Sequence, residues 1–192
     1  IEMHIVQDQA RLTSKSYQET WMSDKARAGG GHLTWLGIHW LDLGMFITGA
    51  KVEQVTGFAG NVGGQPINIE DSAAMSMRFD NGTFGTLTSG YYLDKGNQMH
   101  IKIWGSGGWL QINSEKDRTV EWYSAKSGQG EQSKSFTDQA DFDPYVVFVR
   151  DAVRASMGVS PPPITTQESL RVLQAIHALY RAAETGETQR VN

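Results

Sequence analysis

The chain contains no cysteine, so disulfide bonds, thiolate metal sites and thiol nucleophiles are all excluded. It also has no uncharged apolar run long enough to span a membrane, and no basic stretch followed by an apolar signal core near its N-terminus. Basic residues are scarce: 17 Lys and Arg against 21 Asp and Glu give a net charge of -4. We therefore expect neither nucleic-acid nor membrane binding. The cytoplasm is the default location, although an export signal upstream of Ile1 would be invisible.

The composition is sufficient for one large hydrophobic core. The 192 residues are 39% hydrophobic and 10% aromatic, which predicts a single domain over residues 1–192. In the absence of cysteine, chemistry has to come from histidine, carboxylate, lysine or tyrosine side chains. Because the first residues already have the pattern of a strand, we expect the chain to be a fragment or a processed product.

The first third of the sequence predicts a strand, a polar stretch and a helix. Alternation from Met3 to about Arg11 is typical of a strand, and the polar stretch that follows ends in the three glycines at Gly29–Gly31. Apolar residues then repeat at three- and four-residue steps from Leu33 to Ile47, and Gly49 is placed as a C-terminal stop. This pattern predicts a helix of about four turns.

The middle of the sequence predicts an antiparallel meander. A strand from Val52 to Phe58 is followed by a glycine-rich loop and a half-buried strand from Asp71 to Phe79. Asn81-Gly82 is a hairpin signal, with the returning strand from Phe84 to Ser89. Three more strands are expected around residues 99–103, 110–112 and 120–122, with a turn over Ser114 to Asp117 between the last two.

The last third predicts two helices. Asp143 and Pro144 are typical of a helix N-terminus, and Gly158 is the expected stop. Thr165 and Glu168 have the spacing of a capping box, and Gly186 is the stop of that second helix. The whole order predicts an α+β fold: an open, mainly antiparallel sheet with helices on one face, and the other face available for oligomerisation.

Four ordered landmarks resemble the C-terminal domain of the glucose-fructose oxidoreductase, inositol dehydrogenase and MocA family (GFO/IDH/MocA). They cover nearly the whole chain. They are the segment from Gly29 to Asp42 (GGGHLTWLGIHWLD), Glu70-Asp71-Ser72 with Phe79 to Thr83, the turn from Ile103 to Leu110, and Pro163 to Thr165 leading to Glu184-Thr185-Gly186.

The resemblance implies a larger protein. Members of this family carry an N-terminal Rossmann domain that binds NAD or NADP, followed by a dihydrodipicolinate-reductase-like domain for substrate binding and oligomerisation. We expect this chain to be the second part, with the Rossmann domain absent from it and with no cofactor-binding residue of its own. In agreement, no complete G-x-G-x-x-G is found: after Gly105 and Gly107 the last position is Leu110. The expected partners are that Rossmann domain, further copies of the chain, and a carbohydrate-like small molecule.

The resemblance also implies a catalytic histidine. The family's glycine-rich start is usually followed by an aspartate and, four residues later, a histidine assigned to proton transfer at a substrate hydroxyl. His39 matches the histidine, whereas Trp35 stands where the aspartate would be. On a regular helix His32, Trp35 and His39 share one face with Phe46, so we expect Trp35 and His32 to contact substrate beside His39. The alternative for His32 is a solvated residue at the helix start.

Other residues have weaker assignments. Tyr91, Tyr92 and Lys95 lie where the hairpin leaves the sheet and are expected either to line a substrate pocket or to make a contact between subunits. Asp42 either orients His39 or forms a local cap or ion pair. Glu70 and Asp71 are interpreted as an exposed strand end with a structural role. His39 with Asp42 or His32 does not complete any metal-ligand pattern, so no metal site is expected. Aromatic residues on the strands, such as Trp104 and Trp109, are expected to serve packing or an interface.

Three functions remain open at this point. The first is an NAD(P)-dependent oxidation of a sugar, inositol or related polyhydroxy compound, assisted by His39. The second is a non-catalytic module for carbohydrate binding or oligomerisation, in which Trp35 marks the loss of catalysis. The third is an altered chemistry, such as an NAD-assisted lyase or glycoside-cleaving reaction.

Overall fold

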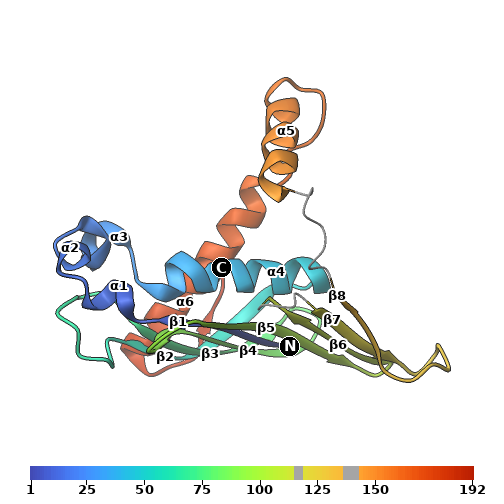
Figure 1. The fold of residues 1–192 in the computed structure, drawn as a ribbon, viewed down its shortest axis with the longest axis horizontal. Helices are drawn as coiled ribbons and strands as arrows, with labels where there is room; N and C mark the ends of the chain where they lie inside the picture. The colour runs from blue at the N-terminus through green and yellow to red at the C-terminus, as the bar shows by residue number, and fades with distance from the viewer. Residues whose placement is uncertain (115–118, 136–142) are drawn as a thin grey trace.

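The computed structural model describes residues 1–114, 119–135 and 143–192, and it shows an α+β fold (Figure 1). One open sheet of nine strands in the described ranges has the order β8-β7-β6-β5-β1-β4-β3-β2-β9. The expected mainly antiparallel sheet is confirmed, with one exception: β1 is parallel to β4. The strands are β1 (Glu2–Asp8), β2 (Val52–Gly60), β3 (Ser72–Phe79), β4 (Phe84–Leu93), β5 (Asn97–Gly105), β6 (Gly108–Asn113), β7 (Thr119–Ser124), β8 (Gln132–Ser135) and β9 (Gln189–Arg190).

The hairpin at Asn81-Gly82 is confirmed. Gly82 has a φ of 83°, in the left-handed region that glycine adopts readily, and β3 pairs with β4 in the expected antiparallel register. The return strand β4 is longer than expected and continues to Leu93. The turn expected over Ser114 to Asp117 lies mostly outside the described residues.

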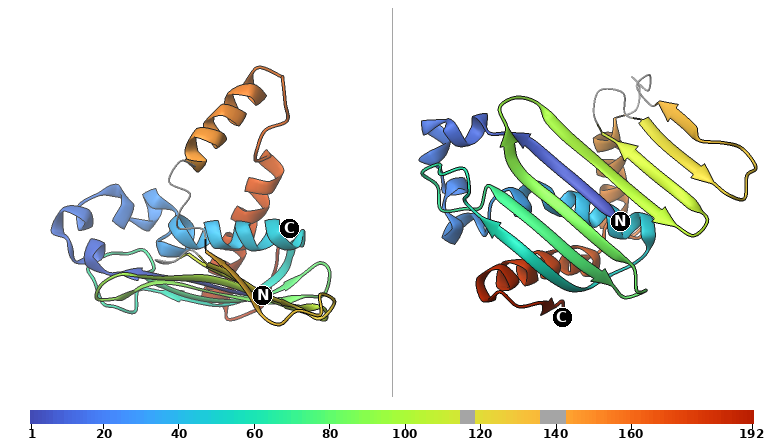
Figure 2. Two further views of the ribbon diagram at one scale, coloured as in Figure 1. Left: turned by 45° about the vertical axis from the view of Figure 1, so that its right-hand side comes forward. Right: turned by 90° about the horizontal axis from the view of Figure 1, so that it is seen from below.

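Two long helices pack on one face of the sheet. A short π-helical turn (Leu33–Gly37) runs directly into α4 (Ile38–Thr48), and α6 (Thr166–Thr185) lies beside it. The view from below in Figure 2 shows the other face, which none of the helices in the described ranges covers. The predicted capping box of α6 is present: Thr165 Oγ1 accepts from the amide of Glu168, and the Glu168 carboxylate accepts from the amide of Thr165.

The main core lies between this helix layer and the sheet. Glycines let α4 approach closely, because a Cβ at Gly44 would contact the sulfur of Met3 and one at Gly37 the hydroxyl of Ser89. Burial of the apolar side chains here is the main force that fixes α4 on the sheet. The fully buried members include Met3, Phe79, Leu87 and Ile101 from the sheet, and Leu33, Leu41, Ile176 and Leu179 from the helices.

The polar stretch before the glycines forms four short turns of helix rather than a loop. They are α1 (Ala10–Thr13), α2 (Lys15–Gln18), the 3₁₀ turn η1 (Trp21–Ser23) and α3 (Lys25–Ala28). They enclose a second, smaller core of Leu12, Tyr17, Ile69 and Tyr91. These four turns, called the short-helix subdomain, stand at the end of the sheet where the helix from Leu33 to Thr48, called the site helix, begins (Figure 1).

Helix α5 (Pro144–Ser156) stands away from the sheet, as Figures 1 and 2 show. Its N-cap Asp143 accepts from the amide of Tyr145, and Gly158 follows with a φ of 71°. Its apolar residues are exposed, among them Tyr145 (78%), Val149 (57%) and Met157 (72%). None of the helices in the described ranges is both long and apolar enough to cross a membrane.

Candidate functional site

The start of the site helix is held by a buried carboxylate. Glu70 Oε2 accepts from the amide of Gly31 at 2.6 Å, and Oε1 accepts from the amide of Leu33 at 3.0 Å. The glycines are needed for this approach, because a Cβ at Gly31 would collide with the Glu70 carbonyl oxygen and one at Gly30 with the hydroxyl of Tyr180. Glu70 and Asp71 are both buried, so their interpretation as an exposed strand end was wrong. Their expected structural role agrees with these bonds.

Two amides of this glycine-rich segment are bound to a carboxylate of the same chain. The amides that could cradle an anion at Gly31 and Leu33 already bind the Glu70 carboxylate. Burial raises the pKa of Glu70, while its bonds with Tyr180 and the two amides act in the opposite direction. This segment therefore positions the start of the helix that follows it.

His32 is not a solvated residue. Its side chain is fully buried, with Nδ1 at 2.7 Å from Ser89 Oγ and the ring edge-on to Tyr91 at 4.4 Å between centroids. The reason is the π-helical turn after it, whose wider winding changes the phase of residue 32 relative to a regular helix. Burial, followed by the charge of Arg11, lowers the pKa of His32 to about 4. As a site residue His32 could act only through its neighbours, since a substrate does not reach it in this conformation.

Trp35 and His39 lie on the exposed side of the helix, one turn apart. Trp35 is 37% exposed, and its Nε1 donates to the carbonyl oxygen of Gly30 at 3.2 Å. His39 is exposed one turn later, and Phe46 (80% exposed) continues the same face. Of the residues expected to meet substrate, these two are the ones that the structure brings together at an accessible surface.

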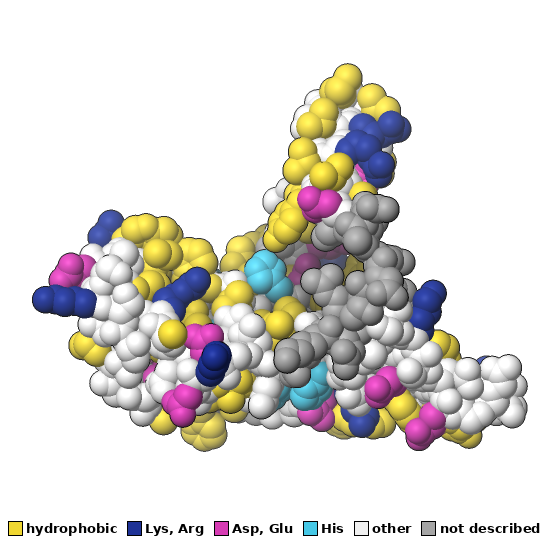
Figure 3. All heavy atoms as spheres, viewed as in Figure 1, with side chains coloured by type: hydrophobic (Ala, Val, Ile, Leu, Met, Phe, Trp, Pro, Cys, Tyr) yellow, Lys and Arg dark blue, Asp and Glu magenta, His cyan; other side chains and the backbone are white. Residues whose placement is uncertain are grey.

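His39 faces an open groove of about 430 Å³ between α4 and the start of α6. In Figure 3, hydrophobic side chains also gather on the short-helix subdomain and along α5, outside the residues that line this groove. Charged side chains line it too, which suits a polar ligand better than a purely apolar one. The lining includes His39, Asp42 and Phe46 from α4, Pro163 and Ile164 before α6, and Glu168 and Arg171 from α6.

Asp42 shares the groove with His39. Partial burial and the charge of Glu168 raise the pKa of Asp42, and His39 acts in the opposite direction. Among the described residues, no hydrogen bond joins Asp42 to His39. The expected orientation of His39 by Asp42 stays a prediction, because the two groups are electrostatic neighbours without a direct bond.

Tyr91, Tyr92 and Lys95, at the end of the hairpin, lie in three different environments. Tyr91 is buried beneath the helix beside His32, and burial raises its pKa. Tyr92 points to the opposite face of the sheet, because successive strand residues alternate, and it is 47% exposed there. Lys95 is exposed in the turn between β4 and β5. Neither Tyr92 nor Lys95 lines the His39 groove, and their expected role, in a substrate pocket or in a contact between subunits, stays a prediction.

Trp21, Arg171 and Tyr180 had no role in the sequence interpretation, and Glu168 was expected only as a helix cap. Tyr180 on α6 bonds both Thr34 and Glu70, and Glu168 and Arg171 face His39 across the groove. Trp21 lies against Trp35, with 5.6 Å between ring centroids. The contacts of Tyr180, Glu168 and Arg171 join segments more than a hundred residues apart, and Trp21 lies in an irregular turn. Neither periodicity nor a local motif indicates such contacts. No group of three potential metal ligands gathers in the described ranges.

The chain is similar to known oxidoreductases. The family model described as the GFO/IDH/MocA C-terminal domain matches residues 1–111. Myo-inositol 2-dehydrogenase from Thermotoga maritima is 22% identical over 172 residues, covering 84% of this chain and 49% of that protein. The chain thus spans about half the length of this relative.

Solved structures share the fold over the whole chain. An oxidoreductase domain protein from Kribbella flavida has a TM-score of 0.80 and 20% identity, covering 100% of this chain and 59% of that one. Levoglucosan dehydrogenase in complex with NADH has a TM-score of 0.82 and 17% identity, covering 100% and 57%. The WlbA dehydrogenase from Bordetella pertussis, in complex with NADH and UDP-GlcNAcA, has a TM-score of 0.78 and 18% identity, covering 100% and 53%. Together with the family match, the four landmarks and the open sheet place this chain in the GFO/IDH/MocA family, as its C-terminal domain.

Proposed function

We propose that this chain is the substrate-binding and oligomerisation domain of an NAD(P)-dependent oxidoreductase that acts on a sugar, inositol or related polyhydroxy compound, and that His39 transfers the proton at the substrate hydroxyl. The observation that carries the proposal is the position of His39: exposed, one turn after Trp35, and facing a groove of about 430 Å³. The family membership and the named activities of the relatives support the class of reaction.

The chemistry fits the groups in the groove. Oxidation of a secondary alcohol requires a base at the hydroxyl, and histidine is the side chain that most often serves as a general base. Asp42 and Glu168 place two carboxylates near His39, so a proton accepted there is balanced by negative charge. The nicotinamide, when bound, supplies the hydride acceptor.

The rest of the proposed protein would complete the site. Several relatives are nearly twice as long as this chain, and the groove and α5 expose apolar side chains on the same side of the sheet. We infer that a Rossmann domain covers this side and brings the cofactor to His39. The uncovered sheet face would then be left for contacts between subunits.

Turnover in the natural gene product that contains this chain tests the role of His39. We expect His39→Ala to lower kcat by at least about a hundredfold, the usual contribution of a general base. His39→Gln keeps most of the volume and should lose a similar factor. His177→Ala is the matched control, because His177 is exposed on α6 outside the groove. An unchanged rate in both His39 variants would contradict the catalytic assignment.

A second candidate, a carbohydrate-binding module without catalysis, is favoured by Trp35. This residue stands where the family has an aspartate. Its indole is held by a hydrogen bond to the Gly30 carbonyl and by contact with the ring of Trp21. Trp35→Asp separates the readings: a gain of dehydrogenase activity would indicate a domain that has lost catalysis. An active natural protein with Trp35 in place would instead show that the aspartate is dispensable here.

A further inference from the structure

Trp21 and Trp35 form an aromatic corner at the head of the site helix. Their ring centroids are 5.6 Å apart and their planes are inclined by 56°. Both indoles remain open to solvent, with 43% of Trp21 and 37% of Trp35 exposed. Two large aromatic side chains that contact each other and still expose this much surface are well placed to receive a third group.

The turn that carries Trp21 is anchored from below. Ser23 is buried, and its hydroxyl donates to the carbonyl oxygens of Gln18 at 2.8 Å and Thr20 at 2.9 Å. The carbonyl oxygen of Ser23 accepts from the amide of Asn68 at 3.2 Å, and Met22 packs on the small core around Tyr17. The residues on either side of the exposed indole are thus fixed, so its orientation is set by the fold.

Trp35 is fixed in a different way. Its polar edge is used by the hydrogen bond from Nε1 to the Gly30 carbonyl, which leaves the hydrocarbon faces of the ring as its open surface. His39 follows one turn later on the same side of the helix and is exposed. Trp35 and His39 are about one helix turn apart, roughly 6 Å along the axis, so a six-membered ring stacked on Trp35 spans the distance toward the imidazole.

We propose that Trp21, with Trp35, is a substrate-positioning residue that stacks on the ring of a cyclic polyol or sugar and presents one of its hydroxyls to His39. This inference rests on the proposed function and adds to it a residue from the short-helix subdomain. The C–H face of a pyranose or cyclitol is apolar and slightly positive, which complements the negative face of an indole. Two faces inclined to each other select such a ring over an open-chain polyol, because a flexible chain would lose more conformational freedom on binding.

The indole signals of tryptophan in ¹⁵N-labelled natural gene product provide the test. The chain has six tryptophans, and only Trp21 and Trp35 form this corner. We expect myo-inositol or D-glucose, at up to about ten millimolar, to move both signals and to leave that of Trp104 unchanged, since ordinary KM values lie below this range. Trp21→Ala should weaken probe binding roughly three- to tenfold, and Trp21→Phe, which keeps a ring, should recover most of it. Val62→Ala, at an exposed loop residue, is the control variant.

Three results would overturn the proposal. One is probe binding that leaves the Trp21 signal in place. Another is an equal loss in Trp21→Ala and Trp21→Phe together with a lowered Tm, which indicates a packing contact. The third is the absence of any indole shift with either probe. If turnover depends on His39 but the Trp21 signal does not move, the proposed function stands and the role of the aromatic corner is refuted.

Discussion

Tyr180 donates its hydroxyl hydrogen to Glu70 Oε1 at 2.9 Å, across 110 residues of chain. Burial, and then the charge of Glu70, raise the pKa of Tyr180, so the hydroxyl retains its hydrogen. Thr34 Oγ1 lies 2.7 Å from the same hydroxyl and, because that hydrogen is committed to Glu70, acts as the donor. The last helix of the domain thereby fixes the start of the helix that carries Trp35 and His39.

Removal of this hydroxyl should destabilise the domain. Tyr180→Phe leaves Glu70 with one donor fewer and Thr34 without its acceptor, so we expect the free energy of unfolding to fall by about 1–2 kcal/mol. Denaturant unfolding of the variant and the wild type measures the difference. Glu184→Gln is the control: its ion pair with Lys25 is exposed at 65% and 47% of the two side chains, and a loss there should be close to zero. An equal decrease in the free energy of unfolding in the two variants would mean that the buried Tyr180 bond stabilises the domain no more than the exposed ion pair does.

The buried His32 predicts acid sensitivity. Its pKa in the folded state is about 4, below the ordinary 6.5, so the unfolded chain takes up a proton in a range where the folded chain does not. The associated stability is complete above pH 6.5, decreases as the pH falls through that window, and is lost near pH 4. The amount is of order 3 kcal/mol. Glu70 acts in the opposite direction, because its raised pKa makes the fold gain stability as the pH falls.

The free energy of unfolding measured against pH checks this prediction. His32→Gln, which keeps a polar partner for Ser89, should flatten the slope between pH 6.5 and 4 relative to wild type. His177→Gln replaces an exposed histidine and should leave the slope as it is. A slope that survives His32→Gln would show that other groups cause the acid sensitivity.

Gly31 should not tolerate a side chain. A Cβ there would collide with the backbone carbonyl oxygen of Glu70, and backbone cannot move aside as a flexible side chain could. Gly31→Ala should therefore cost about 2 kcal/mol or more, and should also disturb the Glu70 bond to this amide. The control is Gly107→Ala, where a Cβ meets open space and the backbone is not in the left-handed region. Thermal unfolding of both variants gives the comparison; similar Tm values would contradict the close approach at Gly31.

The parts of the fold that follow from local chemistry were predictable from the sequence. Gly49, Gly158 and Gly186 were expected to end helices, and all three have φ between 65° and 73°. The hairpin at Asn81-Gly82 is equally local. The strand Gln132–Ser135 was missed because its residues are polar and lack any alternation.

The features of the fold that depend on contacts between distant parts of the chain could not be predicted from the sequence. Nothing in Glu2–Asp8 indicates that this strand inserts between β4 and β5. The burial of His32 depends on one π-helical turn, and the burial of Glu70 depends on Tyr180. The exposure of Trp35 and His39 one turn apart could be expected from their spacing, whereas the positions of Tyr92 and Lys95 are set by the path of the sheet; the roles of all four stay predictions.

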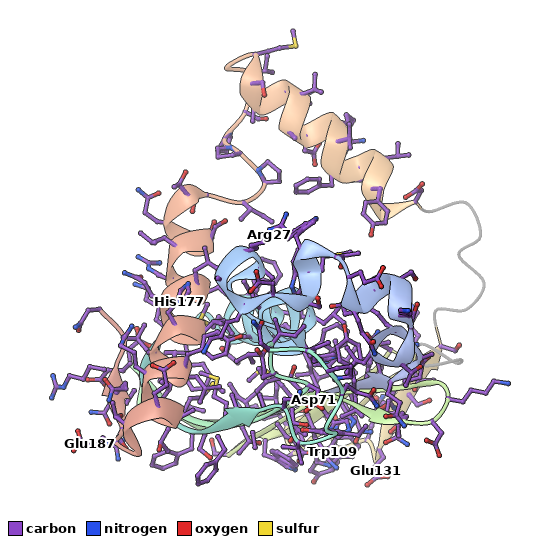
Figure 4. All side chains as sticks on the ribbon, turned by 90° about the vertical axis from the view of Figure 1, so that its left-hand side faces the viewer. Arg27, Asp71, Trp109, Glu131, His177 and Glu187 are labelled. Atoms are coloured by element: carbon purple, nitrogen blue, oxygen red, sulfur yellow. The ribbon has the colours of Figure 1, made fainter. Side chains whose placement is uncertain are left out.

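The uncovered sheet face predicts association between copies of the protein. On this face Lys102 lies between Trp104 and Trp109, at 5.4 and 5.7 Å from their rings, and Phe58 and Phe84 are 80% and 66% exposed. Figure 4 shows Trp109 on the side of the sheet opposite to His177 and α6.

Aromatic residues are enriched in protein interfaces. A group of exposed aromatic side chains on one sheet face is therefore expected to mark a contact with another protein surface. Trp104→Glu adds a charge that association would have to desolvate, so it should shift the natural gene product toward smaller species by light scattering after gel filtration. Val62→Asp, an exposed loop residue, should not. A wild-type protein that is monomeric at micromolar concentration, or a Trp104→Glu variant that keeps its full mass, would show that this face does not serve as the interface.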